Sequence, residues 1–323
     1  MRKHWEVIKK IGQENVAWVY LLGSKLEQGV FIECVDAYDP RYSARQKWVV
    51  ILSSQKGCPV KCRFCDASFY FRGNLSSEEI LEQLDIVLEP HKNGDDCLHS
   101  EKIKLHFARM GEPALNPAVL EVLREIPSIY PGINFIPTVA TVAPSGTEKW
   151  FEELIDIKNT YYSGSRFQLQ FSVNSTDEDF RDYLMPVKKW SAQKISQYGH
   201  NFFRPGDRKV TLNYALSEGT PFEAEEISGT FDPEIFLVKI TPVNPTYQAA
   251  RAGLQTDLKF DGSYSERLAR ELDKLQSHGY EVIISIGSLE EIKVGSNCGQ
   301  LAFYEVKEME NNKYDQEPAN KAI

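Results

Sequence analysis

Short apolar segments rich in β-forming residues alternate along most of the chain with segments of helical period. The apolar segments span residues 49–52, 103–108, 135–141, 167–173, 210–216 and 235–241. Between them, residues 76–88 begin with Ser and Glu at capping-box spacing, and residues 117–125 and 147–155 place apolar side chains at helical period. Strands that alternate with helices form parallel sheets, because each helix returns the chain to the start of the next strand. The sequence therefore predicts an α/β fold, a partial (β/α)6 barrel.

Two further regions flank this predicted barrel. Residues 16–22 and 30–35 alternate in hydrophobicity around the turn-prone SKLEQG, which predicts a small N-terminal β-hairpin. A helix near 265–276 and a strand near 282–286 follow the sixth strand, and the C-terminal residues are polar. We expect an accessory segment at 1–45, a barrel at 46–304 and a polar tail at 305–323.

Composition restricts the class of protein. With 42% hydrophobic and 26% charged residues, the chain resembles folded globular proteins and not disordered ones. No stretch approaches the roughly 20 apolar residues of a membrane helix, and the N-terminus lacks the apolar core of a signal peptide. We expect a cytoplasmic protein without a membrane partner. The net charge of −9 argues against a large sequence-independent nucleic-acid footprint.

Three cysteines, Cys58, Cys62 and Cys65, follow the first predicted barrel strand at CxxxCxxC spacing. A β/α barrel gathers its chemistry at the C-terminal ends of its strands. Three thiolates leave one iron of a [4Fe–4S] cluster without a protein ligand, and that iron could chelate S-adenosylmethionine (SAM) and pass it an electron. A zinc site would need a fourth ligand, so a zinc knuckle completed by Cys34, Cys97 or a histidine is the structural alternative.

Five segments in matching order resemble the RlmN/Cfr family of radical SAM methyltransferases, which modify adenosine in RNA. They are SSQKGCPVKCRFCDASFYFRGNLSSEEILEQ, ARMGEPALN, RDYLMPVKK, ITPVNP and SNCGQLA. Phe64, directly before the third cysteine, is typical of the wider radical SAM superfamily. The resemblance implies that the barrel is a radical SAM barrel and that the chain is a methyltransferase.

The resemblance also implies which residues bind the cofactors. Cys58, Cys62 and Cys65 match the cluster ligands. The positions that match SAM-binding residues are Gly111, Glu112, Thr138, Ser172, Asn174 and Asn244. The Glu112 carboxylate would meet the SAM ammonium in a charge-assisted hydrogen bond. Taken alone, the Gly-Glu-Pro sequence is more often a structural helix entry, and Asn244-Pro is more often a turn.

Cys298 matches the family cysteine that carries the methyl group. By resemblance it takes a methyl from one SAM, loses a hydrogen atom to the 5′-deoxyadenosyl radical from a second, and adds the resulting carbon to an sp² ring carbon. Without the GQLA context, an isolated cysteine is more often an inert buried thiol. The implied partners are SAM, a flavodoxin-like or ferredoxin-like electron donor, and RNA. The acidic charge and the short stretch before the hairpin weigh against RNA.

Two roles of the family have no clear counterpart. Ile51 stands where the family has a second cysteine, which releases the product by forming a disulfide with the methyl-carrying cysteine. Another thiol such as Cys34 or Cys97 would have to replace it, unless product release or the reaction differs. The proton-accepting glutamate of the family has three candidate matches, Glu33, Asp36 and Asp39.

Two other functions remain open from the sequence. One is a radical SAM enzyme that abstracts hydrogen from a small molecule or peptide and has no methyl-cysteine. The other is a nonenzymatic RNA-binding or protein-binding module with a structural cluster. Reductive cleavage of SAM would exclude the second, and analysis of the products would distinguish the first from a methyltransferase.

Overall fold

A sheet of mostly parallel strands forms the centre of the protein. The computed structural model describes residues 3–39, 41–92, 96–296 and 300–316, and within them one sheet has the strand order β1-β2-β3-β4-β7-β8-β9-β10-β11-β12. Its parallel strands are β4 (Trp48–Leu52), β7 (Ile103–Phe107), β8 (Phe135–Thr141), β9 (Gln168–Ser172), β10 (Val210–Leu216), β11 (Phe236–Pro242) and β12 (Val282–Ile284). The predicted mixed α/β fold with a largely parallel sheet is confirmed.

The N-terminal strands are antiparallel and extend the same sheet. The predicted hairpin corresponds to β2 (Ala17–Ser24) and β3 (Phe31–Tyr38), and β3 continues the sheet by pairing with β4. A further strand, β1 (Trp5–Gln13), pairs with β2 and was not predicted. Most β1 side chains are exposed or half-buried, whereas most β2 side chains are buried, so β1 lacks the apolar run that marks β2.

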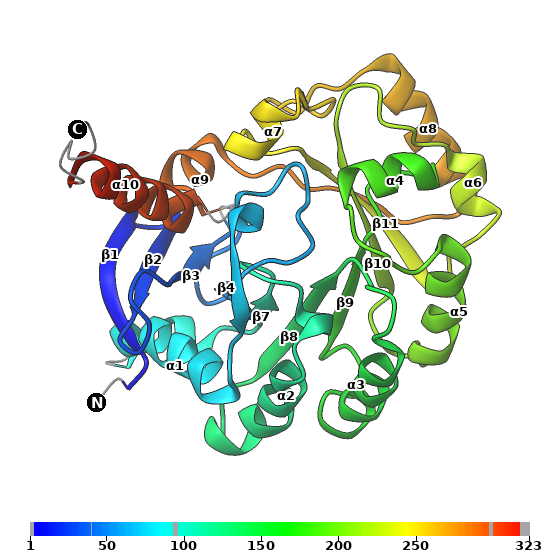
Figure 1. The fold of residues 1–323 in the computed structure, drawn as a ribbon. Coiled ribbons are helices and arrows are strands. Elements are labelled where there is room, and N and C mark those ends of the chain that lie inside the picture. The colour runs from blue at the N-terminus through cyan, green and yellow to red at the C-terminus, as the bar shows by residue number, and fades with distance from the viewer. Residues whose placement is uncertain (1–2, 40, 93–95, 297–299, 317–323) are drawn as a thin grey trace, which may run out of the picture.

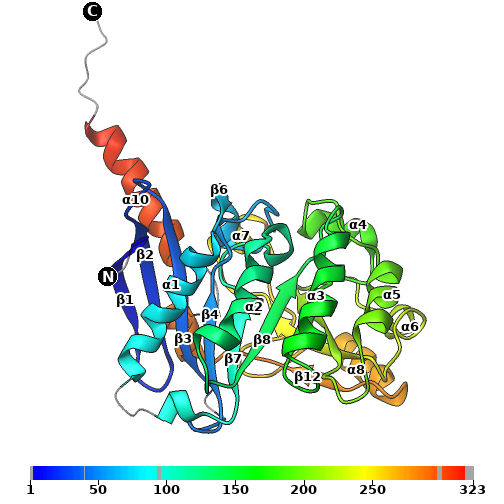
Figure 2. The same cartoon turned by 90° about the horizontal axis from the view of Figure 1, so that it is seen from below.

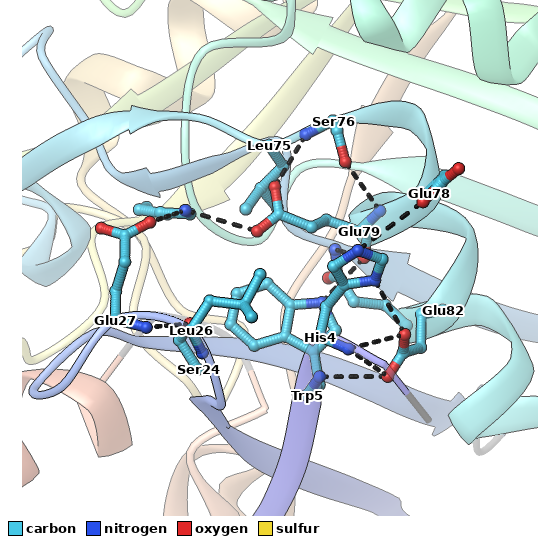
Figure 3. A network of polar contacts seen from close by, with 12 residues as sticks. His4, Trp5, Ser24, Leu26, Glu27, Leu75, Ser76, Glu78, Glu79 and Glu82 are labelled. Carbon is cyan, nitrogen blue, oxygen red and sulfur yellow. Dashed lines mark hydrogen bonds and ion pairs between the residues drawn. The ribbon is translucent and has the colours of Figure 1, made fainter. Parts of the chain in front are cut away.

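Tertiary contacts to the first helix hold the start of β1 (Figure 3). The backbone amides of His4 and Trp5 donate hydrogen bonds to the Glu82 carboxylate of α1 (Ser77–Leu88), at 3.0–3.2 Å. The fully buried Trp5 indole also donates to the Glu79 carbonyl at 2.9 Å. These contacts join residues more than 70 positions apart, which is why local periodicity did not predict β1.

Helices cover one side of the sheet and cross between its parallel strands (Figures 1 and 2). After α1, they are α2 (Ala118–Ile129), α3 (Glu148–Tyr161), α4 (Glu178–Leu184), α5 (Ala192–Phe202), α6 (Ala224–Ser228) and α8 (Glu266–Ser277). The predicted capping box at Ser76 and Glu79 is present. None of the helices in the described part of the chain combines the length and apolar character needed to cross a membrane.

The C-terminal region contains α7 (Tyr247–Arg251), α9 (Leu289–Val294) and α10 (Gln300–Gln316). Residues 305–316 continue α10, so this part of the predicted polar tail is helical. The helix packs on β3 and on the 3₁₀ helix η1 (Asp66–Phe69), and it buries Ala302 and Phe303 at its start. Those two apolar residues anchor a helix whose later residues are mainly polar.

The two faces of the parallel strands differ in character. On β7, Ile103, Leu105 and Phe107 are fully buried in the core beneath the helices, whereas Lys104 and His106 alternate with them and point to the opposite side. We call this opposite side the inner face. On the N-terminal strands β2 and β3, a small apolar cluster of Ala17, Val19, Val35 and Ala37 packs with Ile51 of β4 and other residues.

The packing of α5 on β11 predicts an unusual cost for a glycine-to-alanine change. A Cβ at Gly199 would lie 2.1 Å from the Phe236 ring. Gly199→Ala should lower the free energy of unfolding by about 1–2 kcal/mol, because overpacking outweighs the gain of roughly 0.8–1 kcal/mol in helix propensity. Urea unfolding measures this loss in the free energy of unfolding, with Gly199→Ala placed in the wild-type background and in the Phe236→Leu background. A stabilising effect in the wild-type background would contradict the packing.

Candidate functional site

The three cysteines lie on one loop at the C-terminal end of β4. The loop is held at its base by a two-stranded ribbon of β5 (Gln55–Gly57) and β6 (Phe71–Asn74), and the Cys58 amide donates to the Tyr70 carbonyl at 3.1 Å. Gly57 has a φ of +83°, and a Cβ there would lie 1.9 Å from the Tyr70 carbonyl oxygen. The glycine before the first cysteine therefore allows the ribbon to close.

The thiols lie within electrostatic reach of one another. Cys58 is buried, and Cys62 and Cys65 are half-buried. Burial raises the pKa of each thiol, and the neighbouring Cys65 thiol adds to the rise for both Cys58 and Cys62. Neutral thiols are therefore favoured until a cation is present to stabilise their thiolates.

The donor chemistry suits an iron–sulfur cluster, although its ligation is a prediction. No group of three or more His, Cys, Asp or Glu side chains within the described ranges is arranged to hold a metal ion. Two observations nevertheless agree with a cluster and SAM in this region. Three thiols share one loop, and on β8 the buried Thr138 hydroxyl has no hydrogen-bond partner in the described part of the chain.

The Gly-Glu-Pro turn is joined directly to the segment before the cysteines. The Ser54 amide donates to the Met110 carbonyl at 2.8 Å, and the Glu112 amide donates to Gln55 Oε1, also at 2.8 Å. Gly111 has a φ of +103°, and a Cβ there would lie 2.6 Å from Ser54 Oγ. Only glycine permits this approach, so Gly111 has a structural role whether or not it also contacts SAM.

The Glu112 carboxylate is buried and held in a fixed position. It accepts hydrogen bonds from the Ala114 amide at 3.1 Å, from the Val142 amide at 2.9 Å and from the Thr141 hydroxyl. Burial raises the pKa of Glu112 to about 7, and the hydrogen bonds from Thr141, Val142 and Ala114 oppose that rise. A ligand ammonium would favour the ionised form. The hydrogen bond from the Ala114 amide to Glu112 also caps a short 3₁₀ helix, so the Gly-Glu-Pro turn has the structural role of a helix entry as well.

Three other family-like segments converge on the cysteine loop. The Arg63 amide donates to the Leu184 carbonyl at 2.9 Å, in the RDYLMPVKK segment. The Thr246 hydroxyl, just after ITPVNP, donates to the Phe64 carbonyl at 2.9 Å. The Phe303 ring, just after SNCGQLA, packs on Phe69 with ring centroids 5.2 Å apart.

A buried ion pair ties the last of these segments to the sheet. Arg109 pairs with Glu33 of β3 and donates to the carbonyls of Gly295 and Ser296, each at 2.7 Å. The Ala302 amide donates to the second Glu33 oxygen, also at 2.7 Å. The pair thus holds residues on both sides of positions 297–299. Cys298 itself lies outside the described residues.

The other predicted SAM residues lie at different depths. Thr138 and Ser172 are on the inner face, with Ser172 in register with Asn213. Asn174 is buried, where its side chain accepts from the Ala215 amide at 3.0 Å and donates to Met185 Sδ. These bonds give Asn174 a structural role in joining β9 to β10. Asn244 is half-buried in the loop between β11 and α7.

The missing resolving cysteine has no obvious replacement. Ile51 pairs with Val35 of β3, and both belong to the apolar cluster that also contains Leu301. Cys34 is the neighbour of Val35 and lies on the opposite side of the strand, buried in the main core. Cys97 is buried in the same core, and its thiol donates to the Tyr38 hydroxyl at 3.6 Å. Neither thiol shares the surroundings of Ile51.

Each candidate proton acceptor is engaged within the protein. Glu33 binds Arg109, Asp39 binds Lys47 at 2.6 Å, and Asp36 accepts from the Trp48 indole at 2.7 Å. The structure therefore selects none of them. Arg109 was not predicted to have a role, because a single charged residue after an apolar strand carries little local signal.

Comparisons with known proteins identify the relatives of this chain. No protein-family model matches it. It is 25% identical over 273 residues to the "Probable dual-specificity RNA methyltransferase RlmN" of Bifidobacterium adolescentis, which covers 81% of this chain and 66% of that protein. The protein of the same name from Petrotoga mobilis is 26% identical, covering 94% of this chain and 79% of the relative. The "Dual-specificity RNA methyltransferase RlmN" of Syntrophus aciditrophicus is 30% identical, covering 62% and 54%.

The chain is a distant member of the RlmN family of radical SAM methyltransferases. The predicted family is thereby confirmed, and it is a family of enzymes. The chain spans about two thirds of the length of the Bifidobacterium relative and about half that of the Syntrophus relative. A radical SAM methyltransferase from Sphaerobacter thermophilus has a similar fold, with a TM-score of 0.69 and 20% identity over 93% of this chain and 82% of its own.

The Arg109–Glu33 pair predicts a large stability effect. Arg109→Met should lower the free energy of unfolding by about 3–5 kcal/mol, because it leaves the Glu33 carboxylate buried without its cation. Denaturant unfolding measures the loss. The matched control is the double variant Glu33→Gln/Arg109→Met, which should recover part of the stability because no buried charge remains. A loss below about 1 kcal/mol in the single variant would contradict this assignment.

Proposed function

We propose that this RlmN-family protein is a radical SAM methyltransferase that transfers a methyl-derived carbon through Cys298 to an sp² carbon. By resemblance to the family, that carbon would belong to an adenosine in RNA. One observation carries the proposal. Four family-like segments that are far apart in sequence meet around the cysteine loop, which belongs to the fifth, at the C-terminal end of the parallel strands. A structural zinc knuckle would not need the buried Glu112 beside it.

Separate residues of the chain would bind the cluster and SAM. Cys58, Cys62 and Cys65 would hold a [4Fe–4S] cluster, which when bound supplies the electron for reductive cleavage of SAM. Glu112, fixed by Thr141 and Val142, would bind the SAM ammonium. Gly111, Thr138, Ser172, Asn174 and Asn244 complete the proposed SAM site. On this interpretation, the open, largely parallel sheet is an incomplete (β/α)6 barrel.

The wider assignments follow from the same proposal. An electron donor of the flavodoxin or ferredoxin type would reduce the cluster, and the protein would act in the cytoplasm. We retain the division into an accessory segment at 1–45, a barrel at 46–304 and a C-terminal segment at 305–323.

Ile51 favours a second candidate function. Since an apolar side chain stands where relatives have the resolving thiol, a radical SAM enzyme that abstracts hydrogen from a small molecule or peptide without a methyl-cysteine would fit this position. In that enzyme, Cys298 would not carry carbon.

Methyl-labelled SAM distinguishes the two candidates. Anaerobically reconstituted protein is incubated with a reductant, the labelled SAM and either RNA or a small-molecule extract, and the label is traced into each fraction. The proposal predicts label in modified adenosine together with 5′-deoxyadenosine. Formation of 5′-deoxyadenosine without label in any acceptor would favour hydrogen abstraction.

Replacement of the cluster ligands should remove the iron. Cys58→Ala, Cys62→Ala and Cys65→Ala should each lose the four-iron cluster, because each removes one of only three thiolate ligands. Iron and sulfide analysis of reconstituted protein measures this. Cys97→Ala is the matched control and should keep the cluster. Bound zinc without iron in the wild-type protein would refute the cluster.

Replacement of Glu112 should weaken SAM binding without loss of iron. Glu112→Gln keeps the size of the side chain but removes its charge, so binding should weaken by about 1.5–3 kcal/mol, the usual contribution of a hydrogen bond to a charged group. Equilibrium dialysis with labelled SAM gives the dissociation constant. Thr141→Val removes one contact of the carboxylate but keeps the charge, and it should cost less. An unchanged dissociation constant in Glu112→Gln would leave the turn with only its structural role.

A further inference from the structure

Four polar side chains lie on the inner face of the parallel strands, where Thr138 is in register with His106 and Ser172 with Asn213. They are Lys104 and His106 on β7, Asn213 on β10 and Lys239 on β11. Asn213 is in register with Lys239, and the buried Val238 and Ile240 on either side of Lys239 face the helices. Strand alternation therefore places all four on the same face. We call them the inner polar cluster.

The two lysine side chains have no anionic partner among the described residues. Among the ion pairs of the described residues, none includes Lys104 or Lys239, although both side chains are half-buried. The charged groups that most affect Lys104 are themselves cations and include Lys47 and Lys239, and Lys47 also acts on Lys239. Lys47 is already paired with Asp39. An unpaired ammonium in such a place is costly unless an anion accompanies it.

The pKa shifts agree with this geometry. Burial and, as a smaller contribution, the surrounding cations lower the pKa of Lys104 to about 7 and that of Lys239 to about 8. Burial also lowers the pKa of His106, with Lys104 and Lys239 as the next contributors. The three groups thus lie within electrostatic reach of one another.

Two buried atoms of the inner polar cluster also lack a partner. His106 Nε2 and Asn213 Oδ1 have no hydrogen-bond partner within the described part of the chain. Asn213 is only 8% exposed. Buried polar atoms are nearly always hydrogen-bonded in folded proteins, so these two point to a missing group. Water would satisfy the atoms, but it would not neutralise the lysines.

We propose that the inner polar cluster binds an oxyanion of the phosphate type. Two ammonium groups match the two negative charges of hydrogen phosphate or of a phosphate monoester, and the imidazole donates a further hydrogen bond. Asn213 Oδ1 accepts the proton of hydrogen phosphate, or its amide group donates in the flipped orientation. The inner polar cluster does not include the cysteines, Glu112 or Cys298, and it lies beside Thr138 and Ser172 of the proposed SAM site.

Thermal unfolding of the reconstituted full-length protein tests the site. Inorganic phosphate and adenosine 5′-monophosphate are titrated separately at constant ionic strength, with chloride as the control anion. At least one should raise the unfolding temperature saturably, because a ligand that binds only the folded state stabilises it. The stronger of the two identifies the source as free phosphate or as the phosphate group of a nucleotide. No saturable effect of either beyond that of chloride would overturn the proposal.

Variants locate the effect on the inner face. Lys104→Met and Lys239→Met should each weaken the binding by about tenfold or more, the expected loss of a charge-assisted hydrogen bond. Both should unfold at a higher temperature than wild type without phosphate, because an unpaired buried charge is gone, and this result also shows that they fold. Lys239→Arg should retain binding. Lys9→Met, at an exposed strand position on β1, is the matched control and should bind like wild type. Wild-type affinity in both inner-face methionine variants would place the anion elsewhere and reject the site.

Discussion

The close approach of the Gly-Glu-Pro turn to residues 54 and 55 is the constraint on which the candidate site depends. Gly111 lies so near Ser54 that no side chain fits, and the Glu112 amide binds the Gln55 side chain. The first cysteine follows Gln55 by three residues, on the same ribbon. The backbone of β4 and β7 therefore sets the position of the thiols relative to the buried carboxylate. A parallel pair of neighbouring strands brings both motifs to one edge of the sheet.

Around this constraint, longer-range contacts complete the site. The cysteine loop is bound from α4 through Arg63 and from the start of α7 through the Phe64 carbonyl. On the other side, Arg109 binds the chain just after α9, and Glu33 binds the start of α10. The family-like segments are thus neighbours in space, which their order in the sequence does not by itself require.

Much of the fold could be predicted from the sequence because buried parallel strands are short apolar runs between amphipathic helices. The observed β8 and β10 have the predicted bounds, and β4, β7, β9 and β11 differ from the predicted bounds by one residue at one or both ends. β1 could not be predicted, because its position depends on Glu82 and Glu79 of a distant helix. The Arg109–Glu33 pair and the inner polar cluster were missed for a similar reason. Each joins residues from separate strands, and single charges within apolar strands carry little local signal.

Cys298 is the residue on which the proposed reaction depends, since it separates methyl transfer from simple hydrogen abstraction. The most direct measurement is peptide mass analysis of Cys298 in protein isolated from cells, combined with turnover of Cys298→Ala. Methyl transfer predicts one added methylene unit on the Cys298 peptide and no transfer by the variant, which should still form some 5′-deoxyadenosine. An unmodified Cys298 in active enzyme, with turnover unaffected by Cys298→Ala, would contradict the proposed function.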